Sequence, residues 1–393
     1  MTRDDIARQL VIMVRGPERL KVLAELLKLL GPYSPELVAK WSLTSEEEGE
    51  VLVQLYQFTV PPPQELIEKL NEEPGATVER NMAMSQAAHP NDPLYAEQWA
   101  LTRMSAEAAW GCVAAAGATT PITVAVIDSG IARSHPDLSA RLHPLSKGFL
   151  GPLFDAEDED GHGTFLAGTI GAITDNAIGV ASVTRPISVK LLALKFYNLS
   201  NPLNAATAYQ AIDYAVTSGA KVVNLSWHVA MYSQILFDHI KLAKDVLFVA
   251  AAGNEGTNND ELKIWPACYT LPNLVSVMAT KPIPVKAIDQ FDDKPGFSNY
   301  GLDTVHIAAP GGKVLSTHYG FTTQPPQYRN YTGTSVAAAH VTAAAALVRA
   351  LRPLWKPNHV RHRLMHTVDK SPYLMCKAGG RLNLERAVCH LPP

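Results

Sequence analysis

The sequence has little net charge, no long apolar run and few cysteines. Its 393 residues carry a formal charge of −3, so charge gives no reason to expect nucleic acid or an anionic membrane as a partner. No apolar run reaches the roughly 18 residues that cross a bilayer. Residues 1–8 lead into no apolar signal core, so we expect a cytoplasmic protein as the sequence stands, and a secreted one if a signal was removed.

The four cysteines stand far apart, without the CxxC or Cys/His spacing of a metal site. We expect reduced thiols, and the alternative is a disulfide between Cys376 and Cys389. Internal repeats and low-complexity tracts are missing as well. With 47% hydrophobic residues, the chain has room for one large domain, or for a large domain and a small one.

The first 84 residues predict a small α+β domain. Apolar residues alternate or cluster as in strands at 9–14, 50–58 and 77–80, with room for another strand at 37–43. Helical spacing occurs at 17–30 and 65–70. This order predicts helices on an antiparallel sheet, a ferredoxin-like arrangement. We assign residues 1–84 to this domain, 85–93 to an exposed linker and 94–393 to a second domain.

From residue 122 onward the pattern changes to short apolar runs separated by helical stretches. Near-continuous Val, Ile and Leu runs that alternate with helices favour a parallel sheet covered on both faces. The predicted strands are 122–127, 189–194, 222–225, 246–250 and 274–278, and the predicted helices are 162–173, 205–217, 232–244, 335–351 and 358–365.

Four polar side chains fall where these predicted strands end or these helices begin. Asp128 and Asn254 each follow a buried strand, and sites of parallel sheets form at such ends. His162 opens a helix between two glycines, and Ser335 opens an alanine-rich helix two residues after Gly333. The start of that helix would direct its positive end toward an acyl oxygen.

Each of these residues, taken alone, has an ordinary structural explanation. Ser335 is explained as an N-cap, Asp128 as a helix cap, and Asn254 as a turn residue. His162 is one of thirteen histidines and is explained as a structural one. Together, in the order Asp, His, Ser, they supply the orienter, base and nucleophile of an acyl-transfer triad.

Longer motifs surround these residues. They are Val-Ile-Asp-Ser-Gly at 126–130, His-Pro-Asp-Leu at 135–138, Gly-His-Gly-Thr-Phe-Leu-Ala-Gly at 161–168, Ala-Ala-Gly-Asn-Glu at 251–255, Phe-Ser-Asn-Tyr-Gly at 297–301, Ala-Pro-Gly at 309–311, Gly-Thr-Ser-Val-Ala-Ala-Ala-His at 333–340 and Gly-Arg-Leu-Asn at 380–383. With them, residues 91–388 resemble the subtilisin-like serine proteases (subtilases), and among these the thermitase-like branch. The resemblance implies serine endopeptidase activity and a three-layer α/β fold whose central, mostly parallel sheet is flanked by helices.

The resemblance also implies a role for each residue. Ser335 would form an acyl-enzyme, His162 would take its proton and pass it to the leaving amine, and Asp128 would orient His162. The amide of Asn254, with the backbone N–H of Ser335, would hold the oxyanion. A peptide or protein substrate would pair with the enzyme as added β-structure. The implied substrate-binding residues are Leu225, Ser226, Trp227, His228, Ala251, Ala252 and Gly253.

The N-terminal domain resembles the inhibitor-like propeptide of this family in architecture and position. Such a domain templates the protease and blocks its cleft, so a self-inhibited zymogen, a monomer with its own N-terminal domain as inhibitor, is expected. Self-cleavage would fall between residues 84 and 89. The alternative is an accessory domain that stays attached.

The resemblance further implies a structural calcium ion and no organic cofactor. Six or more oxygen ligands suit Ca²⁺, and the alternative is a set of capping and turn residues without metal. We interpret the acidic residues 155–160 as a solvated face. The implied ligands are side-chain oxygens of Asp92, Asp137 and Asn176 and the carbonyls of Ile173, Ile178 and Val180.

Several positions depart from the family pattern. Phe165 stands where the family has histidine, and Trp227 and His228 stand where it has glycines, so we expect a narrower cleft. Residues 195–202 replace a glycine-rich strand on the opposite side of that cleft. Both changes favour a processing enzyme of restricted specificity.

The serine motif itself differs at Val336 and Ala339, where the family has methionine and proline. Because proline distorts a helix, alanine would let it relax and shift Ser335 slightly. This suggests the alternative of a peptide ligase or macrocyclase that acts on a precursor peptide. An inactive peptide-binding scaffold is the remaining alternative, and the intact set of four residues speaks against it.

Overall fold

The computed structural model describes residues 9–45, 49–80, 89–118, 120–150, 155–198, 200, 204–283, 291–319, 327–389 and 391. The chain divides into two units, Met1–Gln86 and Ala87–Pro393, each with its own internal contacts. The predicted boundaries at 84 and 93 stay predictions. Most of the predicted self-cleavage region, residues 84–88, lies outside the described residues.

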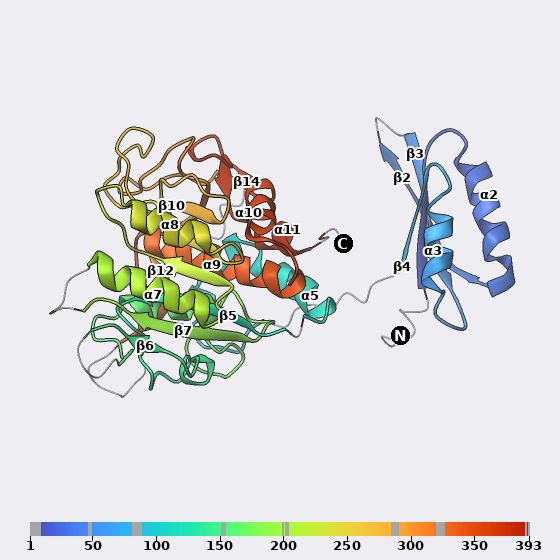
Figure 1. The fold of residues 1–393 in the computed structure, drawn as a ribbon. Coiled ribbons are helices and arrows are strands. Elements are labelled where there is room, and N and C mark those ends of the chain that lie inside the picture. Colours follow the sequence, from blue (N-terminus) through green and yellow to red (C-terminus); the bar gives the residue numbers. More distant parts are fainter. Residues whose placement is uncertain are drawn as a thin grey trace. The chain divides into compact units, whose positions relative to one another are not determined.

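The first unit is a four-stranded antiparallel sheet with two helices (Figure 1). The strand order is β2-β3-β1-β4. Side chains of both helices and of the strands share one core, so both helices cover the same face of the sheet. The α+β arrangement expected for this part of the chain is confirmed. The elements are β1 (Gln9–Val14), α2 (Arg19–Leu30), η1 (Gly31–Tyr33), β2 (Glu36–Ser45), β3 (Gly49–Gln57), α3 (Gln64–Leu70) and β4 (Ala76–Arg80).

The second unit is built on a nine-stranded sheet of order β14-β15-β11-β10-β9-β8-β5-β7-β6. All neighbouring strands run parallel except β14 and β15. The five predicted strands are present with ends shifted by at most two residues. The sheet strands are β5 (Ile122–Asp128), β6 (Lys147–Gly148), β7 (Val189–Lys195), β8 (Val222–Leu225), β9 (Leu247–Ala251), β10 (Leu274–Thr280), β11 (Ile307–Pro310), β14 (Asp369–Lys370) and β15 (Gly380–Arg381).

Helices cover both faces of this sheet, as Figure 1 shows for α7 and α8 on one side and α9 on the other. Alternate residues of β5 enter different cores: Val124 and Val126 pack in one, Ala125 and Ile127 in the other. This alternation explains why the strands are apolar throughout. The helices are α4 (Trp99–Arg103), α5 (Ala106–Ala115), α6 (His162–Gly171), α7 (Ala205–Thr217), α8 (Gln234–Leu242), α9 (Thr334–Leu351), α10 (Pro357–His366) and α11 (Leu384–Val388), with short turns η2 (Tyr95–Glu97) and η3 (Ser139–Arg141).

Helix α9 is the central helix of the second unit. It packs against β8, β9, β10 and β11, and its run of small residues allows this close approach. By length and composition it passes the test for a membrane span, but 94% of its apolar window is buried inside the fold. We therefore interpret α9 as a core helix.

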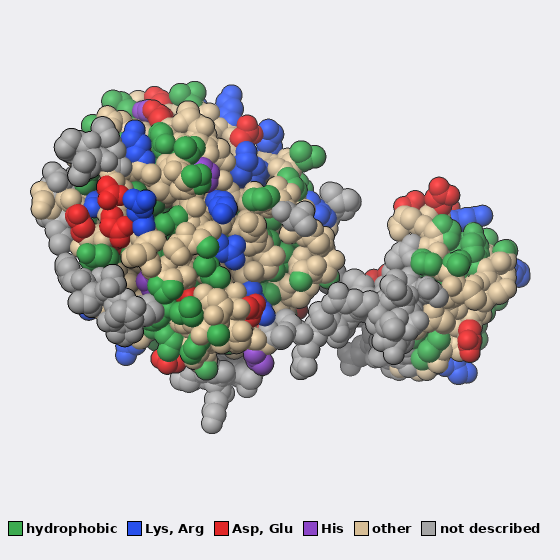
Figure 2. Space-filling model, turned by 90° about the horizontal axis from the view of Figure 1, so that it is seen from below, with side chains coloured by type: hydrophobic (Ala, Val, Ile, Leu, Met, Phe, Trp, Pro, Cys, Tyr) green, Lys and Arg blue, Asp and Glu red, His purple; other side chains and the backbone are tan. Residues whose placement is uncertain are grey.

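The surface carries charges of both signs. On the face drawn in Figure 2, the described Lys and Arg side chains lie among acidic, apolar and uncharged ones.

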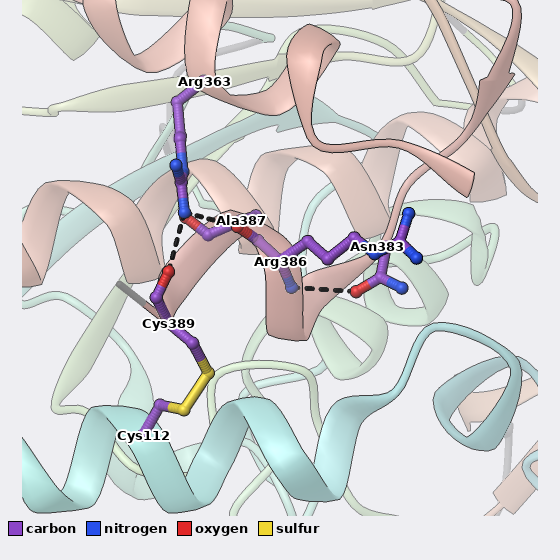
Figure 3. The surroundings of a disulfide bond; sticks show 6 residues. All are labelled: Cys112, Arg363, Asn383, Arg386, Ala387 and Cys389. Carbon is purple, nitrogen blue, oxygen red and sulfur yellow. Dashed lines mark hydrogen bonds between the residues drawn. A yellow bond between two sulfur atoms is a disulfide. The ribbon is translucent and has the colours of Figure 1, made fainter. Parts of the chain in front are cut away.

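The expectation of reduced cysteines is wrong for one pair. Cys112 in α5 and Cys389 after α11 form a disulfide, with a Cα–Cα distance of 5.5 Å (Figure 3). The alternative pairing of Cys376 with Cys389 is also wrong, because Cys376 and Cys268 are buried and unpaired. The partners are 277 residues apart, so only the packing of α5 against α11 brings them together.

Candidate active site

The ends of β5 and β9 and the starts of α6 and α9 carry the four residues singled out in the sequence. Asp128 is the last residue of β5, and Asn254 follows β9 by three residues. His162 is the first residue of α6, and Ser335 is the second residue of α9. Parallel strands present their carboxyl ends at one edge, so this topology gathers side chains from distant parts of the chain.

Asp128 and His162 are hydrogen-bonded. The imidazole Nδ1 lies 2.8 Å from Asp128 Oδ1, and this oxygen also accepts the backbone N–H of Ser129 at 2.8 Å. The Asp128 side chain is 1% exposed and that of His162 is 20% exposed. With Nδ1 bound to the carboxylate, Nε2 is the nitrogen left for proton transfer.

The charge state of His162 is set by opposing effects. Burial alone would lower its pKa, but the charge of Asp128, their hydrogen bond, and the charges of Asp160 and Asp158 outweigh burial and raise the pKa above its ordinary value. A raised pKa stabilises the imidazolium that forms when the base takes a proton.

Asp158 fixes the start of α6. Its carboxylate accepts the N–H groups of Asp160 and Gly161 at 3.0 Å each, and the N–H of Thr164 at 2.9 Å. It also accepts the Thr164 hydroxyl at 2.5 Å. Asp158 is fully buried, so the interpretation of residues 155–160 as a solvated face is wrong at this residue.

The amide of Asn254 is oriented by Thr334. Its Oδ1 accepts the N–H and the hydroxyl of Thr334 at 2.8 and 3.0 Å, and this hydroxyl in turn accepts the N–H of Gly253 at 3.1 Å. The Nδ2 group is therefore left to donate. Gly333 keeps the region open, since a Cβ there would lie 2.9 Å from Ser335 Oγ.

Ser335 is 8% exposed, and its backbone is held by a chain of hydrogen-bonded side chains, of which Asn224 and Thr342 are fully buried. Ser226 donates its hydroxyl to the Ser335 carbonyl at 3.1 Å and accepts from Asn224 Nδ2 at 2.9 Å. Thr342 donates to Asn224 Oδ1 at 2.9 Å. Among the hydrogen bonds between described residues, none joins Ser335 to His162. Such bonds are often long before a substrate binds.

Comparisons with known proteins agree with this geometry. A profile of the Subtilase family matches residues 119–386, more than half of the chain.

The chain belongs to the subtilase family.

Its relatives include several proteases. The chain is 32% identical to an alkaline protease of Shouchella clausii over 352 residues, which cover 88% of this chain and 84% of the relative. The chain is 34% identical to Subtilisin Savinase of Lederbergia lenta, in an alignment that covers 74% of this chain and 97% of the relative. It is 31% identical to Thermitase of Thermoactinomyces vulgaris, in an alignment that covers 76% of this chain and 99% of the relative. A solved protease of Pseudoalteromonas arctica PAMC 21717 matches with a TM-score of 0.62 and 25% identity, over 77% of this chain and 99% of that one. This subtilase is a serine endopeptidase of the subtilisin type, and the expected α/β fold is confirmed.

The predicted substrate-binding residues of this subtilase lie at the ends of two neighbouring strands. β8 and β9 pair in parallel, with Leu225 opposite Ala250. Gly253 has a φ of 104°, and a Cβ there would lie 2.4 Å from the amide nitrogen of Asn299. The remaining members of the set are Ser226, Trp227, His228, Ala251 and Ala252.

The expectation that Trp227 narrows the cleft is wrong. Its side chain is buried beneath the surface, where the indole Nε1 donates to the carbonyl of Ile127 at 3.1 Å and the ring lies 5.2 Å from that of Phe196. His228 does face outward, and its Nε2 lies 3.6 Å from Glu255 Oε1 on the next loop.

An apolar cavity of about 310 Å³ lies beside these strand ends. Phe196 and Trp227 line it from one side, and α7 and the start of α8 line it from the other. Tyr209 and Ser233 also line this cavity, and their hydroxyls bond each other at 2.8 Å.

Phe165, the departure beside the catalytic histidine, is fully buried in α6. Its ring lies 4.7 Å from that of Tyr331, which lies 6.4 Å from the imidazole of His162. An aromatic layer therefore supports the catalytic ring at the place where the family has histidine.

The predicted calcium ligands lie around one tight loop. Asp137 accepts from Asn176 Nδ2 at 2.8 Å and from the N–H of Val180 at 3.2 Å. Asp92 accepts the N–H of Asp175 at 2.9 Å, while its other oxygen is buried without a hydrogen-bond partner among the described residues. Ile173 donates its N–H to the Asp137 carbonyl at 2.8 Å, and Ile178 donates to Asn176 Oδ1 at 2.9 Å.

Sequence reasoning missed three residues that the structure places around the triad. Thr334 orients Asn254, and Thr342 ends the chain of bonds to Ser335. Tyr197 donates its hydroxyl to Asp128 Oδ1 at 3.0 Å. Thr334 lies inside the serine motif and could therefore have been found from the sequence. The roles of Thr342 and Tyr197 depend on packing between distant segments.

Proposed function

We propose that this subtilase is a processing endopeptidase of restricted specificity that is made as a self-inhibited zymogen and cleaves its own N-terminal domain. The catalytic part of the proposal is carried by the hydrogen-bonded pair Asp128–His162, together with Ser335 at the start of α9 and the oriented amide of Asn254.

The catalytic steps follow from these side chains. His162 takes the proton of Ser335 as Oγ attacks the substrate carbonyl, and Asp128 stabilises the imidazolium. Asn254 Nδ2 and the N–H of Ser335 donate to the developing oxyanion. The imidazolium then protonates the leaving amine, and water attacks the acyl-enzyme with His162 again as the base.

The N-terminal unit is proposed as the propeptide. It is a separate α+β unit ahead of the catalytic one. The alignment with the Shouchella clausii protease covers 88% of this chain, which is more than Ala87–Pro393 makes up, so it extends into the N-terminal unit. The alignments with Savinase and Thermitase cover 74% and 76%, close to the share of the catalytic unit.

A structural calcium ion fits the loop around Asp137. Asp92 has a buried, unpaired carboxylate oxygen, and such an oxygen is stabilised by a cation. Asp175 and Ala177 have φ values of 66° and 59°, a backbone shape that turns successive carbonyls of the loop in different directions. Asn176 Oδ1 would bind the ion in place of the hydrogen bond that it accepts from the N–H of Ile178. Bound calcium would tie residues 91–95 to the loop and would take no part in the chemistry.

Restricted specificity is supported by the apolar cavity that Phe196 and Trp227 help to line. Its walls are mostly apolar, so it would accept an apolar substrate side chain several residues from the scissile bond. The pair His228–Glu255 lies at the neighbouring strand ends, so binding there would also depend on the charge of the substrate side chain.

The disulfide between Cys112 and Cys389 supports an oxidising compartment. Disulfides persist outside the reducing cytosol, so we propose an extracytoplasmic site of action in place of the cytoplasmic one expected from the sequence.

Peptide ligation is a second candidate function. Helix α9 runs without interruption through Ala339, which is fully buried where the family has proline. An acyl-enzyme that reacts with an amine acceptor would give ligated products. Product ratios with and without an added amine nucleophile test this, and purely hydrolytic products would exclude it.

The main proposal is tested by intact mass of freshly purified wild type beside Ser335→Ala, each with and without calcium. We expect wild type alone to lose an N-terminal piece of about 85 residues, and calcium to slow later degradation of the remainder. If wild type keeps its N-terminal piece, the proposed self-processing is contradicted. A fluorophosphonate label would then separate an active enzyme with an attached domain, which is labelled, from a scaffold, which is not.

A further inference from the structure

Asp128 receives one hydrogen bond that the triad itself does not require. The hydroxyl of Tyr197 donates to Asp128 Oδ1 at 3.0 Å, beside the bonds from His162 and from the N–H of Ser129. Oδ2 is buried and has no hydrogen-bond partner among the described residues. The orientation of the carboxylate therefore depends on the donors that meet at Oδ1.

The backbone fixes where Tyr197 lies. β5 and β7 pair in parallel with Asp128 opposite Lys195, and the N–H of Phe196 continues this ladder by donating to the Asp128 carbonyl at 3.0 Å. The next residue must then lie beside the Asp128 side chain. The ring of Phe196 lies 5.3 Å from that of Tyr197 and 5.2 Å from that of Trp227, so the segment is packed in place.

We propose that Tyr197 is a positioning residue of the triad, whose hydroxyl holds the Asp128 carboxylate toward His162 and ties it to the chain segment that borders the substrate cleft. The proposal rests on the triad roles given above. Tyr197 transfers no proton and touches no reacting atom. Its hydroxyl limits rotation of the Asp128 carboxylate. By donating to this carboxylate it also takes up part of the negative charge that stabilises the imidazolium of His162.

The charged surroundings keep Tyr197 a donor. Burial first, and then the charges of Asp128 and Asp160, raise its pKa far above the ordinary value, so the phenol stays protonated wherever the enzyme works. Asp158 adds to the same effect. Lys195, the last residue of β7 and two residues before Tyr197, is engaged with the carbonyl of Glu157 at 2.7 Å and with Glu159 at 3.3 Å.

The test compares Tyr197→Phe with Tyr95→Phe in the full chain. Tyr95 is the matched control because its hydroxyl also donates to a carboxylate, that of Glu107 in α5, which is no part of the triad or of the proposed substrate cavity. For Tyr197→Phe we expect kcat on a peptide substrate to fall roughly three- to thirtyfold, with KM within about twofold. The Asp128 carboxylate then keeps its full negative charge and stabilises the imidazolium of His162 more strongly, so the acid limb of kcat/KM moves to higher pH. Tyr95→Phe leaves both the acid limb and kcat unchanged.

Two results would overturn the proposal. An unchanged kcat with an unchanged acid limb means that the bond has no role in catalysis, and a loss confined to KM makes Tyr197 a substrate contact. If wild type itself hydrolyses no peptide, the proposed function fails first. The His162 Nδ1–H resonance in the NMR spectrum of Ser335→Ala still tests the hydrogen bond in that case, since its chemical shift must change with Tyr197→Phe and stay the same with Tyr95→Phe.

Discussion

At the scale of single residues, two carboxylates in the loop before α6 act on His162 without touching its ring. Asp158 is buried and binds the first N–H groups of the helix. Asp160 is partly exposed and accepts the backbone N–H of His162 at 3.1 Å. Both charges raise the pKa of His162, so the pH at which the base becomes active depends on residues outside the triad.

Asp160→Asn is expected to move the acid limb of kcat/KM to lower pH. The base works only when it is neutral, and the Asp160 charge stabilises its protonated form. Removing that charge lowers the pKa of His162, so activity extends further into acid. A pH series of kcat/KM checks this.

Glu159→Gln is the matched control for that series. Its carboxylate pairs with Lys195, and it is not among the main causes of the shift at His162. Equal shifts in both variants, or a shift to higher pH for Asp160→Asn, would contradict the assignment.

The site residues that could be predicted from the sequence differ from those that were missed in where they lie relative to the helices and strands. Asp128, His162, Asn254 and Ser335 stand at ends of elements that hydrophobic patterning locates, inside short motifs. Tyr197 acts two residues beyond β7, and its target is known only once β5 and β7 are paired in register. No pattern within residues 195–202 contains that information.

At the scale of elements, α9 ties the nucleophile to the centre of the sheet. Thr342, seven residues after Ser335, donates to Asn224 at the end of β8, and Asn224 donates to Ser226. Ser226 closes the chain on the Ser335 carbonyl. Thr342 and Asn224 are fully buried, so the bond between them is made away from water, whereas Ser226 is partly buried.

Thr342→Val is expected to destabilise the fold by about 1–3 kcal/mol, because it leaves Asn224 Oδ1 buried without its donor. Urea unfolding checks this in a Ser335→Ala background, where autolysis is absent. Thr342→Ser, which keeps the hydroxyl, is the control and is expected to lose less. A loss for serine that equals or exceeds the loss for valine would contradict the importance of the hydrogen bond.

Strands rich in Val, Ile and Leu were predictable, and strands with small or polar residues were missed. The strands β5 and β7 to β10 are apolar runs, and their patterns located them within two residues. β12 (Val314–His318) and β13 (Gln327–Tyr331) form a hairpin that was missed, because β12 includes Ser, Thr and His and β13 is polar and mostly exposed. Trp227 was assigned to the cleft because sequence alone did not tell which side of the chain past β8 would face inward.

At the scale of the whole catalytic unit, a helix near its beginning is joined to its last described helix. α5 and α11 lie side by side and the disulfide links Cys112 to Cys389 (Figure 3). Arg363 of α10 donates to the carbonyls of Ala387 and Cys389 at 3.0 and 2.7 Å. The segment that leads to Cys389 is thus held both by a covalent bond and by hydrogen bonds from a partly buried guanidinium.

The double substitution Cys112→Ala/Cys389→Ala is expected to lower the free energy of unfolding by about 2–5 kcal/mol. The disulfide closes a loop of 277 residues, and a longer loop restricts the unfolded chain more. Unfolding is measured in the Ser335→Ala background with and without a reducing agent. Reduction should lower the free energy of unfolding of Ser335→Ala to that of the triple variant Cys112→Ala/Cys389→Ala/Ser335→Ala. It should leave the triple variant unchanged. Equal stability of both proteins under oxidising conditions would show that the packing of α5 on α11 suffices without the bond.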